Sequence, residues 1–383
     1  MRFKILFLIL LISQVALAQT KDSTKVRKNL RFSLLGGPGY TPDYGLVIGG
    51  SALLTFSTDT KDSTLKRSVL PLAFGYMFNG GGSAFLRPQI FLKHDKFRIF
   101  GVMSFNYTWE NYYGIGFEQN TNTVKDSDTT QYRSEGFNIN PIFLIRFKES
   151  DLYYGFSFDI AQRDMLKPSA GVLNDSSYIR EGGTKDGLRY FDAGIGINIS
   201  YDTRDVPANP YRGLLLEAGA TGYSTLLGST NNYGVYTFVY KQFLPLAFIG
   251  ERKTLAWMLD TRFTSGDVPL TNLSMIGSPF DLRGYYMGQY RDNNSFVLMA
   301  EYRSMFNMGD KTWMRRLLSK FGYVVWGGLG KVSPEIGNKC DIMPNYGLGL
   351  RIEVQPRMNF RLDVGHDPLN NQTLIYFNMT EAF

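Results

Sequence analysis

Apolar and polar residues alternate along much of the chain with a period of two, which indicates β-strands. Between residues 191 and 202, one set of alternate positions is apolar or aromatic and the other is small or polar. Segments 346–355 and 359–364 repeat this pattern. A soluble β-sandwich would alternate too, but here many segments are long and their polar positions are rich in glycine and paired charges. This combination is typical of a transmembrane β-barrel, whose strands of about 9–11 residues face lipid on one side and a polar lumen on the other.

The alternation predicts sixteen strands within residues 31–383, and bacterial barrels require an even number. Their approximate ranges are 31–37, 45–56, 66–78, 83–93, 96–108, 134–148, 151–163, 187–202, 213–223, 232–243, 252–264, 294–306, 319–330, 344–355, 357–366 and 371–383. We therefore expect an all-β fold, a 16-stranded antiparallel transmembrane β-barrel of the bacterial outer membrane.

The lengths of the connections predict which end of the barrel faces which compartment. If the N-terminus lies in the periplasm, connections after odd-numbered strands are extracellular, and they include the three longest, 109–133, 164–186 and 265–293. Tight turns follow even-numbered strands, at His94-Asp95, Glu149-Ser150 and Pro356. Long loops outside and short turns inside are the usual barrel arrangement. Two connections depart from it, a longer periplasmic one at 307–318 and a short outer turn at 79–82.

The N-terminal segment has the features of a secretory signal peptide. Arg2 and Lys4 precede the apolar run 5–12, and Ala16-Leu17-Ala18 is a small-residue cleavage signal. The alternative, a transmembrane anchor, would need an apolar run able to cross roughly 30 Å of hydrocarbon. We expect residues 1–18 to be removed, so that the mature chain starts at Gln19 with a short periplasmic lead over 19–30.

The C-terminal segment predicts a final strand with an assembly signal. Ile375, Phe377, Met379 and Phe383 share one face of the strand expected at 371–383. Outer-membrane proteins commonly end in such a strand with a terminal aromatic residue, which the assembly machinery reads. Glu381 interrupts the apolar row.

Composition excludes several other classes of protein. Aromatic residues make up 15% of the sequence and charged residues 20%, which argues against disorder. The single cysteine excludes a disulfide scaffold, and a tetrahedral zinc site would need four ligands where only Cys340, His94 and His366 exist. The formal net charge of +7 is small and not clustered, so we expect no nucleic-acid partner.

Catalytic candidates are few. A Ser–His or Asp–His centre would have to use His94, in a tight turn, or His366, which stands beside Asp367 near a strand end. No serine in a nucleophile elbow accompanies them, and Cys340 lies in an outer loop as an unpaired thiol. We expect no enzymatic activity and no cofactor.

Two motifs relate the predicted barrel to a known family. Residues 280–285, Phe-Asp-Leu-Arg-Gly-Tyr, lie in the sixth outer loop and resemble the (Val/Ile/Leu)-Arg-Gly-(Phe/Tyr) motif of the Omp85 superfamily, the BamA/TamA-like bacterial surface antigen barrels. Residues 201–213, which contain Asp-x-Arg-Asp, Asn-Pro and Gly, resemble the family's segment between the eighth and ninth strands. Residues 299–303 are similar to its twelfth-strand pattern. The resemblance is clearest over 187–383.

In that family the sixth loop folds back into the lumen, which would carry Leu282, Arg283, Gly284 and Tyr285 inside the barrel. A guanidinium in a lumen requires a carboxylate, and a bidentate pair is strong and geometrically specific. Gly284 permits a tight backbone turn, and Tyr285 can pack its ring and still form a hydrogen bond.

The alternation places three carboxylates on the lumen face as candidate partners of Arg283, namely Glu301, Glu353 and Asp363. The family often carries an Asp on the thirteenth strand, but Gly328 stands at that position here. Because this departure weakens the usual pairing, we expect Glu353 to be the partner.

The second motif is expected at the periplasmic end of the eighth strand. Its residues are Asp202, Arg204, Asp205, Pro210 and Gly213, and Pro207 also stiffens the turn. A structural network at the barrel rim is the favoured interpretation, and direct contact with a substrate is the alternative.

The resemblance implies a role in outer-membrane biogenesis, through insertion or assembly of outer-membrane proteins or translocation across the membrane. In the family a weak lateral seam joins the first and last strands, and the short first strand expected at 31–37 would close the barrel poorly. A short strand in a stable barrel is the alternative.

Family members capture clients with POTRA domains, for which the sequence ahead of the barrel has no room. We therefore expect contact with outer-membrane lipid and with other envelope assembly proteins that supply periplasmic recognition. The alternatives are an accessory or structural barrel subunit of a larger envelope complex, and a passive pore.

Overall fold

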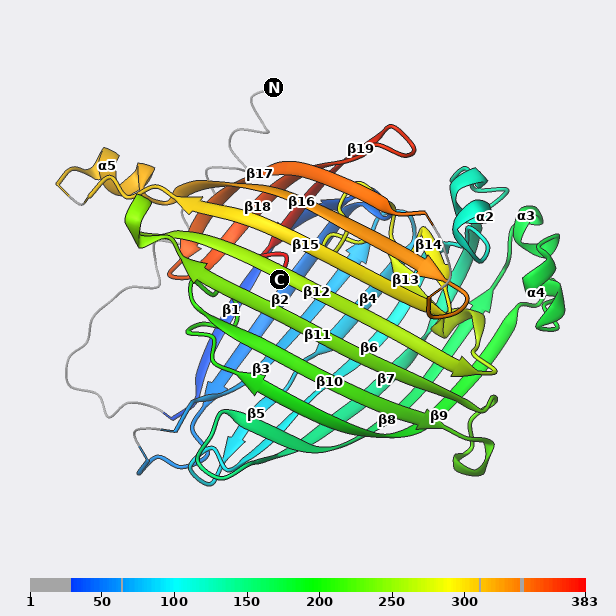
Figure 1. Cartoon of the computed structure of the whole chain (residues 1–383), viewed down its shortest axis with the longest axis horizontal. Coiled ribbons are helices and arrows are strands. Elements are labelled where there is room, and N and C mark those ends of the chain that lie inside the picture. The colour runs from blue at the N-terminus through cyan, green and yellow to red at the C-terminus, as the bar shows by residue number, and fades with distance from the viewer. Residues whose placement is uncertain (1–28, 63–64, 310, 338–340) are drawn as a thin grey trace.

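The computed structural model describes residues 29–62, 65–309, 311–337 and 341–383. They form one antiparallel barrel with short helices at its two ends (Figure 1). The expected signal peptide, nearly all of the expected lead at 19–30, and Cys340 lie outside the described residues.

The barrel wall is built from strands that follow one another in sequence order. They are β1 (Arg31–Thr41), β2 (Gly45–Phe56), β3 (Ser68–Met77), β4 (Gly81–Leu86), β5 (Gln89–Leu92), β6 (Phe97–Asn111), β7 (Gln131–Arg146), β8 (Leu152–Leu166), β9 (Leu188–Asp202), β10 (Gly213–Tyr223), β11 (Tyr233–Pro245), β12 (Lys253–Gly266), β15 (Asn294–Met305), β16 (Phe321–Ser333), β17 (Met343–Gln355), β18 (Met358–Asp367) and β19 (Gln372–Met379).

Two of these labels belong to one strand of the barrel. Both β4 and β5 pair with β3 on one side and β6 on the other, and Arg87-Pro88 separates them. Proline lacks the N–H group that a ladder needs, so it interrupts the strand. With β4 and β5 counted together, the wall has sixteen strands, which confirms the predicted fold class. The remaining pair, β13 (Ser274–Ile276) and β14 (Tyr290–Asp292), forms a separate hairpin.

The barrel has apolar side chains outside and polar ones inside. Ile195, Ile197 and Ile199 on β9 are exposed, whereas Asp192 on the other face of that strand is fully buried. Exposed large apolar side chains in continuous rows are abnormal for a soluble protein and normal for a lipid-facing wall. The faces expected from the alternation are therefore the faces that the strands adopt.

The connections separate into two ends of the barrel. The three longest, 112–130, 167–187 and 267–293, lie at one end (right in Figure 1), which we call the long-loop end. The opposite, short-turn end holds the turns 93–96 and 356–357 and the longer connection 306–320. Helical segments lie in these connections: α2 (Phe117–Asn122), α3 (Ala170–Leu173), α4 (Ser176–Arg180), η2 (Thr225–Leu227), η3 (Ala247–Ile249), η4 (Leu270–Asn272) and α5 (Trp313–Leu318). None of the helices in the described ranges is long and apolar enough to span a bilayer.

The first and last strands differ from the prediction. Strand β1 does not end at Gly37 but runs through Pro38 to Thr41, because an edge strand tolerates a residue without an N–H group. Strand β19 does not reach Phe383 but ends at Met379. Both differences affect the place where the barrel closes.

Candidate functional site

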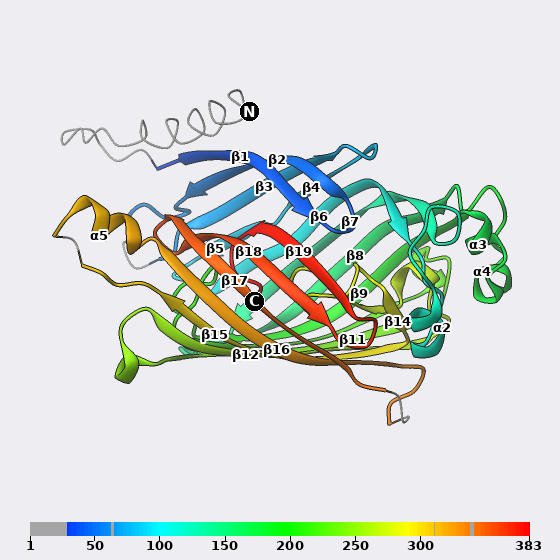
Figure 2. The same cartoon turned by 90° about the horizontal axis from the view of Figure 1, so that it is seen from above.

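The sixth loop, 267–293, enters the lumen and fills part of it (Figure 2). Leu282, Arg283 and Tyr285 have no exposed surface. Leu282 and Tyr285 pack with the inner face of β15, β16 and β17 in the largest buried hydrophobic cluster of the described structure. The Leu-Arg-Gly-Tyr part of the segment that resembles the Omp85 motif, 282–285, is thus buried.

Arg283 contacts two carboxylates on two different strands. Its Nη1 donates a hydrogen bond to Asp363 Oδ2 on β18 at 2.8 Å, and its Nη2 donates to Glu301 Oε1 on β15. All three side chains are fully buried. The guanidinium also lies 3.6 Å from the ring centroid of Trp326 on β16, a cation–π contact. Arg283 therefore joins the loop to three strands of the wall at once.

The expectation that Glu353 would be the partner of Arg283 is wrong. Glu353 lies near the short-turn end, where its Oε2 accepts a hydrogen bond from Arg252 Nη2 at 2.6 Å. The alternation correctly placed three carboxylates on the inner face, but it carries no information about depth along the barrel. The glycine at position 328 has a steric explanation, because a Cβ atom on Gly328 would lie 2.1 Å from the sulfur of Met299.

The two carboxylates that bind Arg283 also accept hydrogen bonds from other arginines. Asp363 also accepts from Arg351 Nη1 at 2.6 Å and from Arg361 Nη1 at 3.0 Å, and Glu301 accepts from Arg303 Nε at 2.8 Å. Arg361 reaches back to the loop, donating to the backbone oxygen of Pro279 at 2.7 Å. Sequence reasoning missed these arginines, although Arg351 and Arg361 stand directly opposite each other on β17 and β18. Two arginines directly opposite each other on the inner face repel unless a carboxylate lies between them. This opposed pair was the feature of the sequence that could have predicted a shared acidic partner.

Backbone contacts fix the loop against β18 and β19. The Gly284 N–H donates to the hydroxyl of Tyr376 at 2.9 Å, and that hydroxyl donates to the Tyr285 oxygen at 3.1 Å. Gly284 has a φ of 115°, and a Cβ atom on it would lie 2.8 Å from the backbone of His366. A Cβ atom on Gly365 would lie 2.7 Å from the backbone of Arg283. Only glycine allows the two backbones to approach this closely.

Asp281, two residues before Arg283, is a carboxyl group whose pKa is strongly shifted by its surroundings in the loop. Burial raises the pKa of Asp281 to about 7, against the opposing effect of hydrogen bonds from Ser278 and from the backbone of Leu282 and Gly277. Its Oδ1 atom is buried without a hydrogen-bond partner. The docked loop therefore favours the protonated form of this carboxyl group.

The last residues of the chain turn into the lumen. Thr380 has a left-handed φ of 68°, and after it Glu381 accepts hydrogen bonds from Arg351 Nε at 2.8 Å and Asn359 Nδ2 at 2.7 Å. Arg303 Nη2 donates to the backbone oxygen of Phe383 at 2.9 Å. Both views place the C-terminus within the outline of the barrel (Figures 1 and 2).

This position corrects the expected C-terminal strand signal. Phe377 remains on β19 and stacks on Phe360, with ring centroids 5.6 Å apart, and Met379 is the last residue of the strand. Phe383, however, is buried in the lumen beside Phe243. The physical reason is Glu381, whose carboxylate binds a buried arginine and could not do so from a lipid-facing strand.

The barrel closes between β1 and β19 through a single registered pair, Tyr40 with Phe377. By contrast, β1 pairs with β2 through eleven registered positions and β18 with β19 through eight. Because β19 ends at Met379 and the chain then turns inward, the part of β1 nearer the short-turn end has no partner strand on that side. The weak contact thus arises from the end of the last strand, and the expected cause, a short first strand, is wrong.

The second motif forms contacts at the short-turn end. Arg204 pairs with Asp202 through two hydrogen bonds of 2.9 Å, and Gly213 has a φ of 98°. Asp205 Oδ2 accepts from Arg357 Nη2 at 2.6 Å, and Pro210 is buried in the same turn. Asp205 lies in the turn between β9 and β10, and Arg357 lies in the turn between β17 and β18. Along the wall, four strands separate β10 from β17, namely β11, β12, β15 and β16. This ion pair therefore reaches across the mouth of the barrel.

The two histidines lie far apart along the barrel axis. His94 is in the short-turn end and contacts Asp62 at 2.5 Å, whereas His366 is near the long-loop end and contacts Thr373 at 2.9 Å. Among the described residues, no group of His, Cys, Asp and Glu could hold a metal ion.

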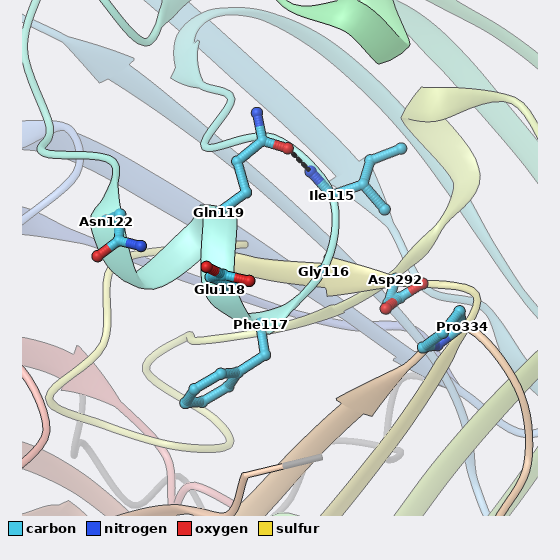
Figure 3. Close-up of a pocket in the computed structure, with 8 residues that line it drawn as sticks. All are labelled: Ile115, Gly116, Phe117, Glu118, Gln119, Asn122, Asp292 and Pro334. Carbon is cyan, nitrogen blue, oxygen red and sulfur yellow. Dashed lines mark hydrogen bonds between the residues drawn. The ribbon is translucent and has the colours of Figure 1, made fainter. Parts of the chain in front are cut away.

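A cavity of about 600 Å³ lies at the long-loop end beside α2 (Figure 3). Its lining includes the carboxylates Glu118 and Asp292, together with Gln119, Asn122 and Pro334. Gln119 Oε1 is already occupied by the Ile115 N–H at 3.1 Å. The lining contains no histidine, lysine or nucleophilic side chain.

The sequence matches the Omp85 superfamily domain over residues 78–383. This chain belongs to the Omp85 superfamily. The match includes the Arg283 loop, the Asp202–Gly213 turn and thirteen of the sixteen strands, and the family shows that the protein is an integral β-barrel of the outer membrane. No curated protein sequence matches the chain significantly.

Several solved structures share the fold at low sequence identity. BamA from Haemophilus ducreyi lacking POTRA domains 1–3 is 12% identical with a TM-score of 0.62, over 93% of this chain and 71% of that chain. CdiB from Acinetobacter baumannii is 12% identical with a TM-score of 0.52, and CdiB from Escherichia coli is 9% identical with a TM-score of 0.57. This chain spans 60% and 63% of the length of those two proteins.

Proposed function

We propose that this Omp85 barrel inserts or translocates polypeptides at the outer membrane through the seam between β1 and β19. The observation that carries the proposal is the single registered pair, Tyr40 with Phe377, at the closure of the barrel. Family membership supports outer-membrane protein insertion or translocation in general. The seam supports the narrower mechanism, because it is the place where the wall can open at least cost in hydrogen bonds.

The unpaired part of β1 is suited to bind an extended segment. Strand β1 keeps its full ladder with β2, from Arg31 to Thr41, but its other edge has no β19 partner over most of that length. An unsatisfied backbone group in hydrocarbon costs several kcal/mol, so an incoming strand that pairs with this edge is strongly favoured. Strand addition to a sheet edge is an established mode of peptide recognition.

The sixth loop supports the wall beside the seam. Arg283 binds Asp363 on β18, and Gly284 binds Tyr376 on β19. These contacts hold the last two strands from the inside, while the other edge of β19 pairs with β1 at one position. We propose that the Arg283 motif keeps this side of the seam rigid, so that opening is confined to β1.

We infer that the barrel acts without catalysis and together with other envelope proteins. Omp85 family membership supports both inferences. Affinity purification from native membranes tests for stable partners.

A disulfide across the seam tests the mechanism. In a Cys340→Ser background, Tyr40→Cys with Phe377→Cys would close the seam at its registered pair. The matched control is Tyr40→Cys with Leu46→Cys, a registered pair of β1 and β2 that leaves the seam free. Each variant replaces the wild-type protein in depleted cells, and the outer-membrane proteome is measured with and without reductant.

We expect the seam disulfide to deplete outer-membrane proteins and reductant to restore them, while the control disulfide has no effect. Normal function with a fully formed seam disulfide would refute the lateral mechanism. If depletion of the protein itself leaves the outer-membrane proteome unchanged, the assembly role is wrong, and the accessory barrel and the pore become the remaining functions.

A further inference from the structure

Helix α5 (Trp313–Leu318), in the connection 306–320, is exposed on all sides. Trp313 exposes 65% of its surface, and Met314, Leu317 and Leu318 expose 46%, 43% and 38%. In both views the helix projects past the ends of the strands at the short-turn end (Figures 1 and 2). A helix of six residues gains little stability by itself, so burial of its apolar side chains against another surface would stabilise it.

The helix separates apolar and basic side chains onto two arcs. With 3.6 residues per turn, Trp313 and Leu317 lie one turn apart, Met314 and Leu318 lie beside them, and Arg315 and Arg316 occupy the remaining arc. Thr312 caps the N-terminus, its hydroxyl accepting from the Arg315 N–H at 3.3 Å. Tryptophan and leucine on one face with arginine on the other are typical of a helix that lies in a membrane interface.

The apolar arc continues the lipid-facing surface of the barrel. On the outside of β15 and β16, Tyr302 and Tyr323 have ring centroids 6.0 Å apart, and Phe306 lies 6.2 Å from Tyr323. Phe306 is exposed, and the chain then passes through the exposed Met308 to the helix. Aromatic rings at the end of barrel strands mark the level of the membrane interface.

The adjacent turn extends the same surface. Phe248 in η3 is 85% exposed, and this turn is tied to the connection 306–320 by Glu251 with Asn307 at 2.7 Å and by Arg252 with the Ser319 oxygen at 2.7 Å. Two neighbouring connections at the short-turn end thus both present large apolar side chains.

The charge of the connection fits an anionic surface. Residues 306–320 contain Lys311, Arg315, Arg316 and Lys320 against one acidic residue. Basic residues beside an interfacial apolar face are attracted to the phosphates of lipid head groups. We propose that α5 is an interfacial anchor that binds the periplasmic leaflet of the outer membrane, with Trp313 and Leu317 among the acyl chains and Arg315 and Arg316 at anionic head groups.

A fluorescent probe on each arc of the helix tests this proposal. In a Cys340→Ser background, Leu317→Cys places an NBD label on the apolar arc, and Arg316→Cys places it on the basic arc as the matched control. Each full-length labelled protein is reconstituted into vesicles of phosphatidylcholine with or without phosphatidylglycerol. Heat-dependent migration on gels establishes that each barrel is folded.

We expect brominated acyl chains to quench the label at 317 and aqueous iodide to quench the label at 316. Adding Arg315→Glu to the Leu317→Cys protein should shift the helix toward water by roughly fivefold or more in vesicles containing phosphatidylglycerol, and Arg315→Lys should retain binding. This charge dependence should weaken in phosphatidylcholine alone.

Three results would overturn the anchor. The label at 317 could be as accessible to iodide as the label at 316 in both kinds of vesicle. It could be shielded only at high protein-to-lipid ratio, which would assign the surface to a second copy of the chain. It could also be shielded only after periplasmic proteins are added, which would assign the surface to a protein partner.

Discussion

Arg283 and Asp363 are eighty positions apart in the sequence, yet the guanidinium Nη1 donates to the carboxylate Oδ2 at 2.8 Å with neither side chain exposed. The pair links a loop that enters from the long-loop end to a strand next to the seam. A buried arginine without its carboxylate is strongly destabilising, so this contact defines the docked position of the loop.

Replacing Asp363 should release the loop. Asp363→Ala leaves Arg283, Arg351 and Arg361 without their shared acceptor, and we expect a loss of about 3–5 kcal/mol in barrel stability. Heat-dependent gel migration and limited proteolysis of the sixth loop measure the two effects. Arg283→Ala and Glu301→Ala should be non-additive, since they remove the same ion pair.

The matched control for that cycle is Glu353, which contacts Arg252 at the rim. Arg283→Ala combined with Glu353→Ala should show additive effects. A coupling energy as large as that between Arg283 and Glu301 would contradict the assigned pairing.

Docking of the sixth loop should weaken as the pH rises. Because the docked loop raises the pKa of Asp281 from its usual value near 4 to about 7, the carboxyl group favours docking fully at pH values below about 4. That contribution is lost as the pH rises toward and above 7, where docking requires a buried charge. Hydrogen exchange of the loop amides at pH 5 and pH 8.5 measures the change.

Asp281→Asn should remove most of this pH dependence and protect the loop at pH 8.5. The control is Asp267→Asn in the same loop, whose carboxylate contacts Asn231 in an exposed position. An equal response of both variants would attribute the pH dependence to other groups.

Removing the Glu381 carboxylate should free the residues that follow β19. Glu381→Ala leaves Arg351 without one of its two acids, and we expect the last residues to leave the lumen more often. In a Cys340→Ser background, maleimide labelling of Ala382→Cys should be several-fold faster with Glu381→Ala. Unchanged labelling would show that the buried position of Phe383 alone holds the tail.

The ion pair across the short-turn mouth should restrict conductance more than it stabilises the barrel. Arg357→Ala removes the contacts to Asp205 Oδ2 and to the Asn209 oxygen, and a partly exposed pair contributes only about 0–1 kcal/mol. We expect higher single-channel conductance in planar bilayers with little change in thermal stability. Arg204→Ala is the control, because Arg204 pairs with Asp202 within its own turn. Equal effects of the two variants would contradict a bridge across the mouth.

The pH dependence of this bridge has the opposite sign to that of the loop. Burial acts to raise the pKa of Asp205, but hydrogen bonds from Arg357 and from the backbone of Tyr211 outweigh it and lower the pKa below its usual value. The bridge is therefore present at neutral pH and is lost only as the pH falls through that lowered pKa. Conductance should rise in acid in the wild-type protein and less so in Arg357→Ala.

Much of the barrel could be read from the alternation of residues. Strands β2 and β10 have the predicted bounds, and the lipid-facing row Ile195, Ile197 and Ile199 is exposed as expected. A period of two determines which face each side chain occupies, because one face must meet lipid and the other the lumen. The same rule placed Glu301, Glu353 and Asp363 inside.

Which inward carboxylate meets Arg283 depended on the tertiary structure. Glu353 and Asp363 lie on adjacent strands, but one is near the rim and the other lies where the loop descends. The depth of each carboxylate along the barrel axis depends on the tilt of the strands, and its distance from Arg283 depends on the path of the loop through the lumen. The local period of two gives no information about either. The buried position of Phe383 also depended on the tertiary structure. The apolar pattern placed Phe383 on the face of the last strand, whereas the hydrogen bond between Glu381 and Arg351 holds the end of the chain inside the barrel. Periodicity acts over a few residues and decides faces, whereas ion pairs between distant strands decide where the loop and the chain end are held.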